Sequence, residues 1–272
     1  MTAIVARAMM ALLISTVCFA KSGMIERGGL GFIYTDNNSF ANPANFGEVK
    51  GFSIDGKYTT ANSNASLGAT ASAVYGTGSF GIGAYDNRSG SSLTSTGFFS
   101  DSAGVGLGVG LMHGKVLVGA GYRQTVSGTA ADTGGVNASV TVKNEKGISF
   151  GVAGSQQLGS VSGTNKQTAT AGVGFAASNG IMTELAMTLN NIAEMSNYTA
   201  GAFLTKGGQN AYVGLGYYYD SLGNGGSGVA THTGAARLGV ILGRSFDMSI
   251  FAQYTFVAGA TPAYGATIRY AL

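Results

Sequence analysis

The chain has 272 residues, of which 10% are charged, whereas a soluble domain typically carries about 25% charged residues. Glycine accounts for 46 residues and proline for only two, and no Gly-X-Y period occurs, which excludes collagen. Because 45% of the residues are hydrophobic, glycine-rich disorder is excluded as well, and a net charge of +3 is too small to indicate a nucleic-acid-binding protein.

Residues 1–20 have the pattern of a secretory signal peptide. Arg7 supplies the positive charge, an apolar stretch of ten residues follows, and Cys18 and Ala20 are the small residues before a cleavage site. After residue 20 no apolar run is long enough for a transmembrane helix. We therefore expect Sec-dependent export. Cys18 is the only cysteine, so the mature chain would contain no thiol.

Residues 21–46 do not alternate between apolar and polar side chains, unlike the rest of the chain. We expect this segment, called the hatch below, to form a compact plug or an inward-tucked arm of the β-barrel that the following residues predict, because a large barrel otherwise leaves an open channel. Its distinctive elements are Arg27-Gly28-Gly29-Leu30-Gly31, Asp36 and Asn42-Pro43-Ala44.

These three elements, in this order, resemble the N-terminal hatch of the FadL/TodX family of outer-membrane transporters for hydrophobic compounds. The resemblance implies a plugged barrel with a lateral exit and passive movement of hydrophobic molecules. It places hatch or substrate-path roles on Arg27, Gly28, Gly29, Asn42, Pro43 and Ala44. The chain is shorter than the fatty-acid transporters of that family and lacks their apolar loop insertions, so the resemblance does not extend to fatty-acid specificity.

From residue 47 to the C-terminus, short segments alternate between apolar and small or polar side chains. In residues 246–256, for example, Met248 and Ile250 share one face and Asp247 and Ser249 share the other. Strict alternation is typical of a strand between two unlike environments. Fourteen such segments are expected, at 49–60, 66–75, 78–86, 102–113, 115–127, 137–143, 147–157, 167–177, 181–190, 197–206, 209–219, 233–243, 246–257 and 262–271. Segment 137–143 is the weakest, and losing it with a neighbour would leave twelve strands.

The connections between these segments alternate between tight and longer. The tight ones are expected at 76–77, 114, 144–146, 178–180, 207–208 and 244–245. Loops that are short at one end and longer at the other are typical of outer-membrane barrels, and a soluble sandwich has no reason to keep that alternation. The absence of a fixed short repeat argues against a β-solenoid. The sequence thus predicts an all-β fold: an antiparallel transmembrane β-barrel, residues 47–272, with the hatch in front, located in the outer membrane of a Gram-negative cell.

By alternation, eight charged side chains are expected to point into the lumen. They are Asp55, Lys57, Lys115, Arg123, Glu184, Arg237, Asp247 and Arg269. Such residues most simply pair with one another or with the hatch, and alternatively set ion preference or orient a ligand. A row of inward glycines at 104, 106, 108 and 110 would leave room for the hatch, packed there through Phe32, Tyr34 or Phe40, or for an apolar ligand.

No arrangement of residues favours an enzyme. The two histidines, His113 and His232, are expected at a periplasmic turn and at the outer rim, without the spacing of a catalytic triad or a metal site. We expect no catalysis, cofactor or metal. The favoured function is FadL-like passive transport of small hydrophobic compounds; the alternatives are a structural, surface-anchoring or binding barrel without transport and, third, a general diffusion porin. The expected partners are outer-membrane lipid and a small hydrophobic ligand, lipid or detergent in the lumen, with no nucleic acid, and a monomer is favoured.

Overall fold

The computed structural model describes residues 42–61, 66–90, 98–127, 133–158, 167–177, 180–208, 210–221, 229–243, 245–257 and 262–272. The predicted signal peptide and the hatch up to residue 41 lie outside the described residues, and with them Arg27, Gly28, Gly29, Phe32, Tyr34 and Phe40.

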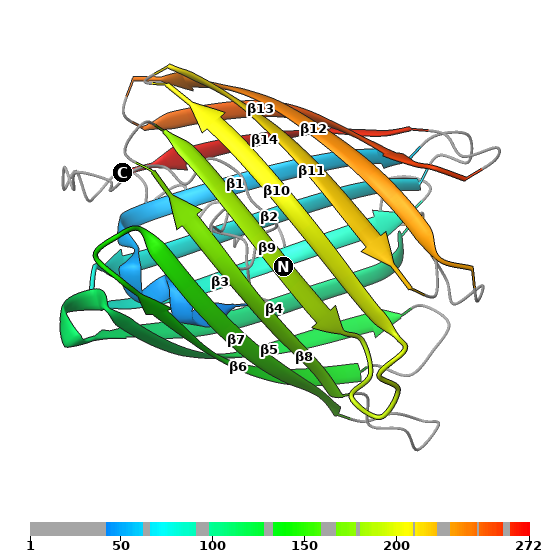
Figure 1. Ribbon diagram of the computed structural model, residues 1–272, viewed down its shortest axis with the longest axis horizontal. Coiled ribbons are helices and arrows are strands. Elements are labelled where there is room, and N and C mark those ends of the chain that lie inside the picture. The colour runs from blue at the N-terminus through cyan, green and yellow to red at the C-terminus, as the bar shows by residue number, and fades with distance from the viewer. Residues whose placement is uncertain are drawn as a thin grey trace.

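The described residues form one closed barrel of fourteen strands, in which each strand pairs with its chain neighbours and β1 pairs antiparallel with β14 (Figure 1). The strands are β1 (Lys50–Ala61), β2 (Ser66–Thr77), β3 (Phe80–Gly90), β4 (Phe98–Leu111), β5 (Val116–Ser127), β6 (Thr133–Lys143), β7 (Ile148–Leu158), β8 (Gln167–Ala176), β9 (Ile181–Leu189), β10 (Tyr198–Gly207), β11 (Ala211–Asp220), β12 (Thr231–Leu242), β13 (Phe246–Thr255) and β14 (Ala263–Ala271). The predicted fold is confirmed with fourteen strands rather than twelve, since β6 contains the weak segment 137–143.

The tight connections lie at one end of the barrel, together with the start of β1 and the end of β14. One predicted turn is wrong: residues 76–77 belong to β2, and the turn falls at Gly78-Ser79. Gly78 has φ of +86°, a conformation that glycine adopts at little cost, whereas Gly76 is an inward-facing strand residue. Between β4 and β5 the turn is a short 3₁₀ helix, η2 (Met112–Gly114), which places His113 at the turn expected for it.

The outer surface has the composition of a surface in contact with lipid. Outward-facing positions carry exposed large apolar side chains, and aromatic ones gather toward both ends of the strands. Near the tight turns these are Tyr75, Phe80, Phe150, Phe175 and Tyr270; toward the other end they are Tyr58, Tyr122, Tyr217, Tyr254 and Tyr264. Paired aromatic girdles flank the apolar band of transmembrane barrels.

Strand length agrees with a membrane span. The strands have 9 to 14 residues, which corresponds to about 30–46 Å of strand, or about 21–33 Å of height at a tilt near 45°. Figure 1 shows the strands running obliquely around the barrel, strongly tilted from its axis. Among the described residues, no helix is both long and apolar enough to cross a membrane.

Candidate functional site

The last residues of the predicted hatch, together with Gly47 and Glu48 after them, form a short 3₁₀ helix inside the barrel, η1 (Pro43–Glu48), called the hatch helix below. Pro43 stands in the first turn, where its fixed φ favours a helical start. The helix packs against the inner wall made by β2 to β6, most extensively against β4 and β5. Ala44 and Phe46 are buried, so this helix closes part of the lumen. Two of its residues, Pro43 and Ala44, belong to the predicted hatch motif, and Asn42 directly precedes it.

The wall beneath η1 is made of glycine because the helix backbone occupies the space of a side chain. A Cβ atom at Gly119 would lie 2.2 Å from the Ala44 nitrogen, and one at Gly108 would lie 2.5 Å from the Pro43 carbonyl oxygen. At Gly106 it would lie 2.7 Å from the Phe46 ring. Three glycines of the predicted row, Gly106, Gly108 and Gly110, therefore accommodate residues of η1, whereas Gly104 makes room for the Tyr85 ring.

Hydrogen bonds from β6 fix the position of η1. Asn42 Nδ2 donates to Thr141 Oγ1 at 2.9 Å, and the Ala44 backbone nitrogen donates to Ser139 Oγ at 2.9 Å. Asn42, Ser139 and Thr141 are all buried, so losing one partner would leave a polar group without compensation for its desolvation. The helix is thus fastened to the wall by both packing and buried hydrogen bonds.

An ion pair also holds the end of η1 to β6. Lys143 Nζ lies 2.5 Å from Glu48 Oε2, and the two side chains are 21% and 30% exposed. We expect Lys143→Gln to lower the free energy of unfolding by about 0.5–1 kcal/mol, because partly exposed pairs contribute little. A urea titration, in which the folded fraction is followed by heat-modifiable gel mobility, measures this loss of unfolding free energy. Lys146→Gln, at an exposed position in the following turn, should leave the midpoint unchanged; an equal loss in both variants would contradict the tether.

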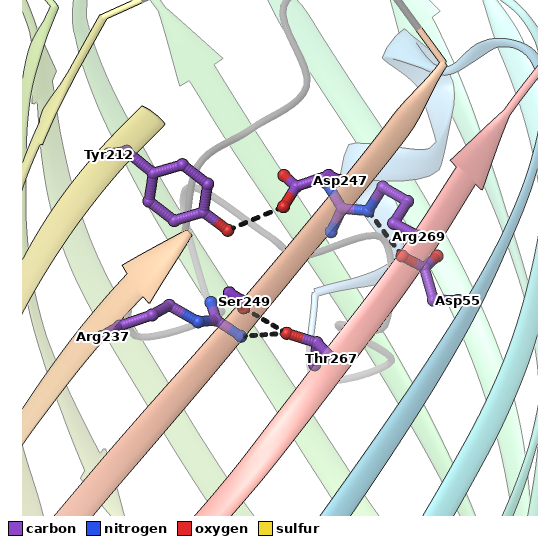
Figure 2. A network of polar contacts seen from close by, with 7 residues as sticks. All are labelled: Asp55, Tyr212, Arg237, Asp247, Ser249, Thr267 and Arg269. Atoms are coloured by element: carbon purple, nitrogen blue, oxygen red, sulfur yellow. Dashed lines mark hydrogen bonds and ion pairs between the residues drawn. The ribbon is translucent and has the colours of Figure 1, made fainter. Parts of the chain in front are cut away.

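The opposite wall, formed by β1 and β11 to β14, carries a polar network (Figure 2). Arg269 Nε lies 2.5 Å from Asp55 Oδ1, and Tyr212 donates its hydroxyl proton to Asp247 Oδ1 at 3.0 Å. Arg269 stands directly opposite Asp55 on β1 and Asp247 on β13, so one guanidinium lies between two carboxylates. Asp55, Asp247 and Arg269 are nearly fully buried. Alternation placed all three in the lumen.

Two residues further along these strands lies a second tier. Arg237 Nη2 donates to Thr267 Oγ1 at 3.2 Å, and Thr267 hydrogen bonds Ser249 (Figure 2). Lys57 Nζ lies 5.2 Å and Arg237 Cζ 5.9 Å from the ring centroid of Phe251, within cation–π range. Phe251 breaks the alternation of β13 because its inward ring covers Gly265, where a Cβ would lie 2.2 Å from Phe251 Cζ.

The remaining predicted lumen charges fall in different places. Glu184 is 1% exposed on β9, and Arg123 is exposed on the inward face of β5. The prediction for Lys115 is wrong: this residue precedes β5 in the turn, is 57% exposed and pairs with Glu145 at 2.6 Å. Alternation fails there because Lys115 lies beyond the strand end.

Toward the long-loop end, the inner wall is lined by hydroxyl and amide groups. Cross-strand pairs of inward side chains hydrogen bond around the barrel: Thr70 with Asn87 at 2.7 Å, Ser155 with Thr168 at 2.7 Å, Thr170 with Thr188 at 2.9 Å, and Thr233 with Thr255 at 3.0 Å. Directly opposed side chains of this kind stabilise neighbouring strands. They also give the lumen a polar, uncharged surface. Within the part of the chain described, no group of three His, Cys, Asp or Glu residues could hold a metal ion.

The alternation pattern did not single out several residues that hold the interior together. Leu117 is fully buried on the inward face of β5, and Ser139 and Thr141 receive the hatch. Tyr212 bonds Asp247. The available signal was polar residues at every second position of 137–143, which identifies the inward face but not its partner.

Comparison with solved structures supports the same fold. The outer membrane protein Omp33 of Acinetobacter baumannii superposes with a TM-score of 0.55 at 12% identity, over 83% of this chain and 100% of that one. The chain shares the closed antiparallel β-barrel fold of that outer membrane protein. A bacterial polysaccharide outer membrane secretin gives a TM-score of 0.53 at 10% identity, over 83% of this chain and 99% of that one. A KdgM porin gives a TM-score of 0.46 at 8% identity, over 81% of this chain and 99% of that one.

No protein-family model matches the chain, and no curated protein sequence matches it. The structural likeness, at such low identity, concerns the barrel alone. The FadL/TodX resemblance therefore still rests on residues 27–44, of which only 42–44 are described.

Proposed function

We propose that this protein is a passive, non-catalytic channel of the Gram-negative outer membrane, exported by its predicted signal peptide, through which small polar solutes diffuse beside the hatch. The observation that carries this proposal is the polar inner wall. Hydroxyl and amide pairs line its long-loop half, and the β11–β14 wall continues with charged and hydroxyl side chains. Such groups replace the hydrogen bonds that a polar solute loses when it leaves water.

The position of η1 on the β2–β6 wall supports a solute route along the opposite wall, formed by β1 and β11–β14. The hatch helix is fixed to β2–β6 by glycine packing and by hydrogen bonds from Ser139 and Thr141. A helix held in this way narrows the lumen without having to move. In this proposal the protein works as a monomer, since each barrel contains its own path.

A second candidate is FadL-like transport of small hydrophobic compounds. It is favoured by the hatch motif and by the buried apolar side chains of Pro43, Ala44 and Phe46 within the lumen. The polar wall offers such a compound few contacts, which is why we place this candidate second.

Reconstitution of the mature chain in liposomes separates the candidates. A polar channel predicts swelling in a pentose solution at a rate that rises with protein content, and slow entry of a labelled hydrophobic compound. Entry of the hydrophobic compound without swelling would favour the second candidate. If neither solute enters although the barrel is inserted and heat-modifiable, the proposed function is wrong and an anchoring or binding role replaces it.

A further inference from the structure

We propose that the channel prefers small anions, which a cationic patch on the lumen wall attracts. The patch, defined by Lys57, Arg237, Phe251 and Thr267, lies on β1, β12, β13 and β14. This inference rests on the proposed function and adds the class of solute to it.

The register of the barrel brings the patch together. Lys57 stands opposite Thr267, and Phe251 stands opposite Arg237. Lys57 and Arg237 both lie against the Phe251 ring, and Arg237 also donates to Thr267. The ring and the hydroxyl thus position two cations on one stretch of wall.

Acidic and basic side chains differ in their access to lumen water. Among the described residues, the inward carboxylates of Asp55, Glu184 and Asp247 are 4%, 1% and 5% exposed. Asp220 also faces inward and is partly exposed, but it lies at the long-loop end of β11, six residues along the strand from the level of Arg237. Lys57 is exposed and Arg237 is partly exposed. At the level of the patch, a passing ion therefore meets cations, whereas the acids of β1, β9 and β13 lie within the wall.

The other charges facing the patch do not cancel it. Two residues along the strands toward the tight turns, Arg269 lies between Asp55 and Asp247, so that this tier neutralises much of its own charge. Across the lumen, Lys143 and Glu48 form a pair, while Arg123 on β5 adds an exposed cation. Rings of Arg and Lys favour anions in other pores.

The expected size of the preference follows from Coulomb's law. A unit charge about 7 Å from a passing ion in water changes the local concentration of that ion by about threefold, and salt near 0.1 M reduces the effect to about 1.6-fold. Each patch cation raises the local chloride concentration and lowers the local potassium concentration by about 1.6-fold in such salt, so the chloride-to-potassium ratio should change by about threefold for one cation and by about sevenfold for both.

The reversal potential of the mature protein in a planar bilayer under a potassium chloride gradient tests the inference. We expect a chloride-to-potassium permeability ratio above one. The ratio should fall by about sevenfold in the double variant Lys57→Gln/Arg237→Gln, and by about threefold in each single variant. The control Arg88→Gln/Lys146→Gln removes two cations from an outward position of β3 and from a tight turn, and should leave the ratio unchanged.

The outcomes of this experiment test the anion preference and the proposed channel function separately. A conducting wild-type protein with a ratio at or below one overturns the anion preference but not the channel. An unchanged ratio in the single variants also overturns it, and these variants retain the Asp55–Arg269–Asp247 tier that stabilises the wall. A correctly inserted wild-type protein that does not conduct overturns the proposed function, and the anion preference with it.

Discussion

Replacing Gly119 with alanine is expected to push the hatch helix off the wall and to raise the conductance of the barrel. The new Cβ would lie 2.2 Å from the Ala44 nitrogen and 2.3 Å from the Pro43 carbonyl carbon. Both are backbone atoms, so no side-chain rotation relieves the overlap. Overpacking of this kind costs about 1–3 kcal/mol, which displacement of a short helix can relieve. Single-channel recording in planar bilayers measures the result.

Gly108→Ala should give the same phenotype, since its Cβ would lie 2.5 Å from the Pro43 carbonyl oxygen. Gly56→Ala is the matched control, because nothing lies within 4 Å of its Cβ position. If Gly119→Ala and Gly108→Ala conduct like Gly56→Ala and keep its stability, the hatch is not packed on this wall in the membrane.

Removing the guanidinium of Arg269 should destabilise the barrel more than removing any other lumen charge. Arg269→Gln would leave Asp55 and Asp247 buried without the cation between them. Breaking a buried ion pair by deleting one partner typically costs about 3–5 kcal/mol. The urea midpoint of unfolding, followed by heat-modifiable gel mobility, should fall accordingly.

The surface pair of Lys115 and Glu145 provides the comparison. Its side chains are 57% and 81% exposed, so Lys115→Gln should cost less than about 1 kcal/mol. In Arg269→Gln, the additional change Asp55→Asn should recover part of the loss, because it removes one buried carboxylate. Equal losses in Arg269→Gln and Lys115→Gln would show that the Arg269 cluster contributes no more than a surface pair.

The barrel could be predicted from the sequence because lipid and lumen impose opposite demands on alternate residues. In β13, the period of two places Met248 and Ile250 outside and Asp247 and Ser249 inside, and strand bounds shift by only a few residues. The errors come at strand ends, as at Lys115 and at the turn after β2, where the period stops and local turn chemistry decides.

The interior was harder to predict because a strand pattern does not say which far segment fills the space it leaves. Four inward glycines on β4 indicated a close neighbour, and the structure shows that η1 is this neighbour for three of them and the Tyr85 ring for Gly104. Alternation likewise placed Asp55, Asp247 and Arg269 inside, but the contact of Asp55 with Arg269 depends on closure of β14 onto β1, across 214 positions of sequence. Phe251, an apolar residue on the inward face of β13, departs from the alternation because its ring fills the space beside Gly265 on β14, which the pattern of β13 alone does not reveal.

The central claim is that η1 stays on the β2–β6 wall while solutes pass along the opposite wall, formed by β1 and β11–β14. The 2.9 Å hydrogen bond from the Ala44 nitrogen to Ser139 Oγ makes these two positions the pair to cross-link, in the variant Ala44→Cys/Ser139→Cys, with disulfide formation checked by thiol titration. The most direct measurement is the conductance of this variant in planar bilayers, oxidised and then reduced. We predict equal conductance in both states; a channel that closes on oxidation and reopens on reduction would show that the hatch must leave the wall, and would contradict this account.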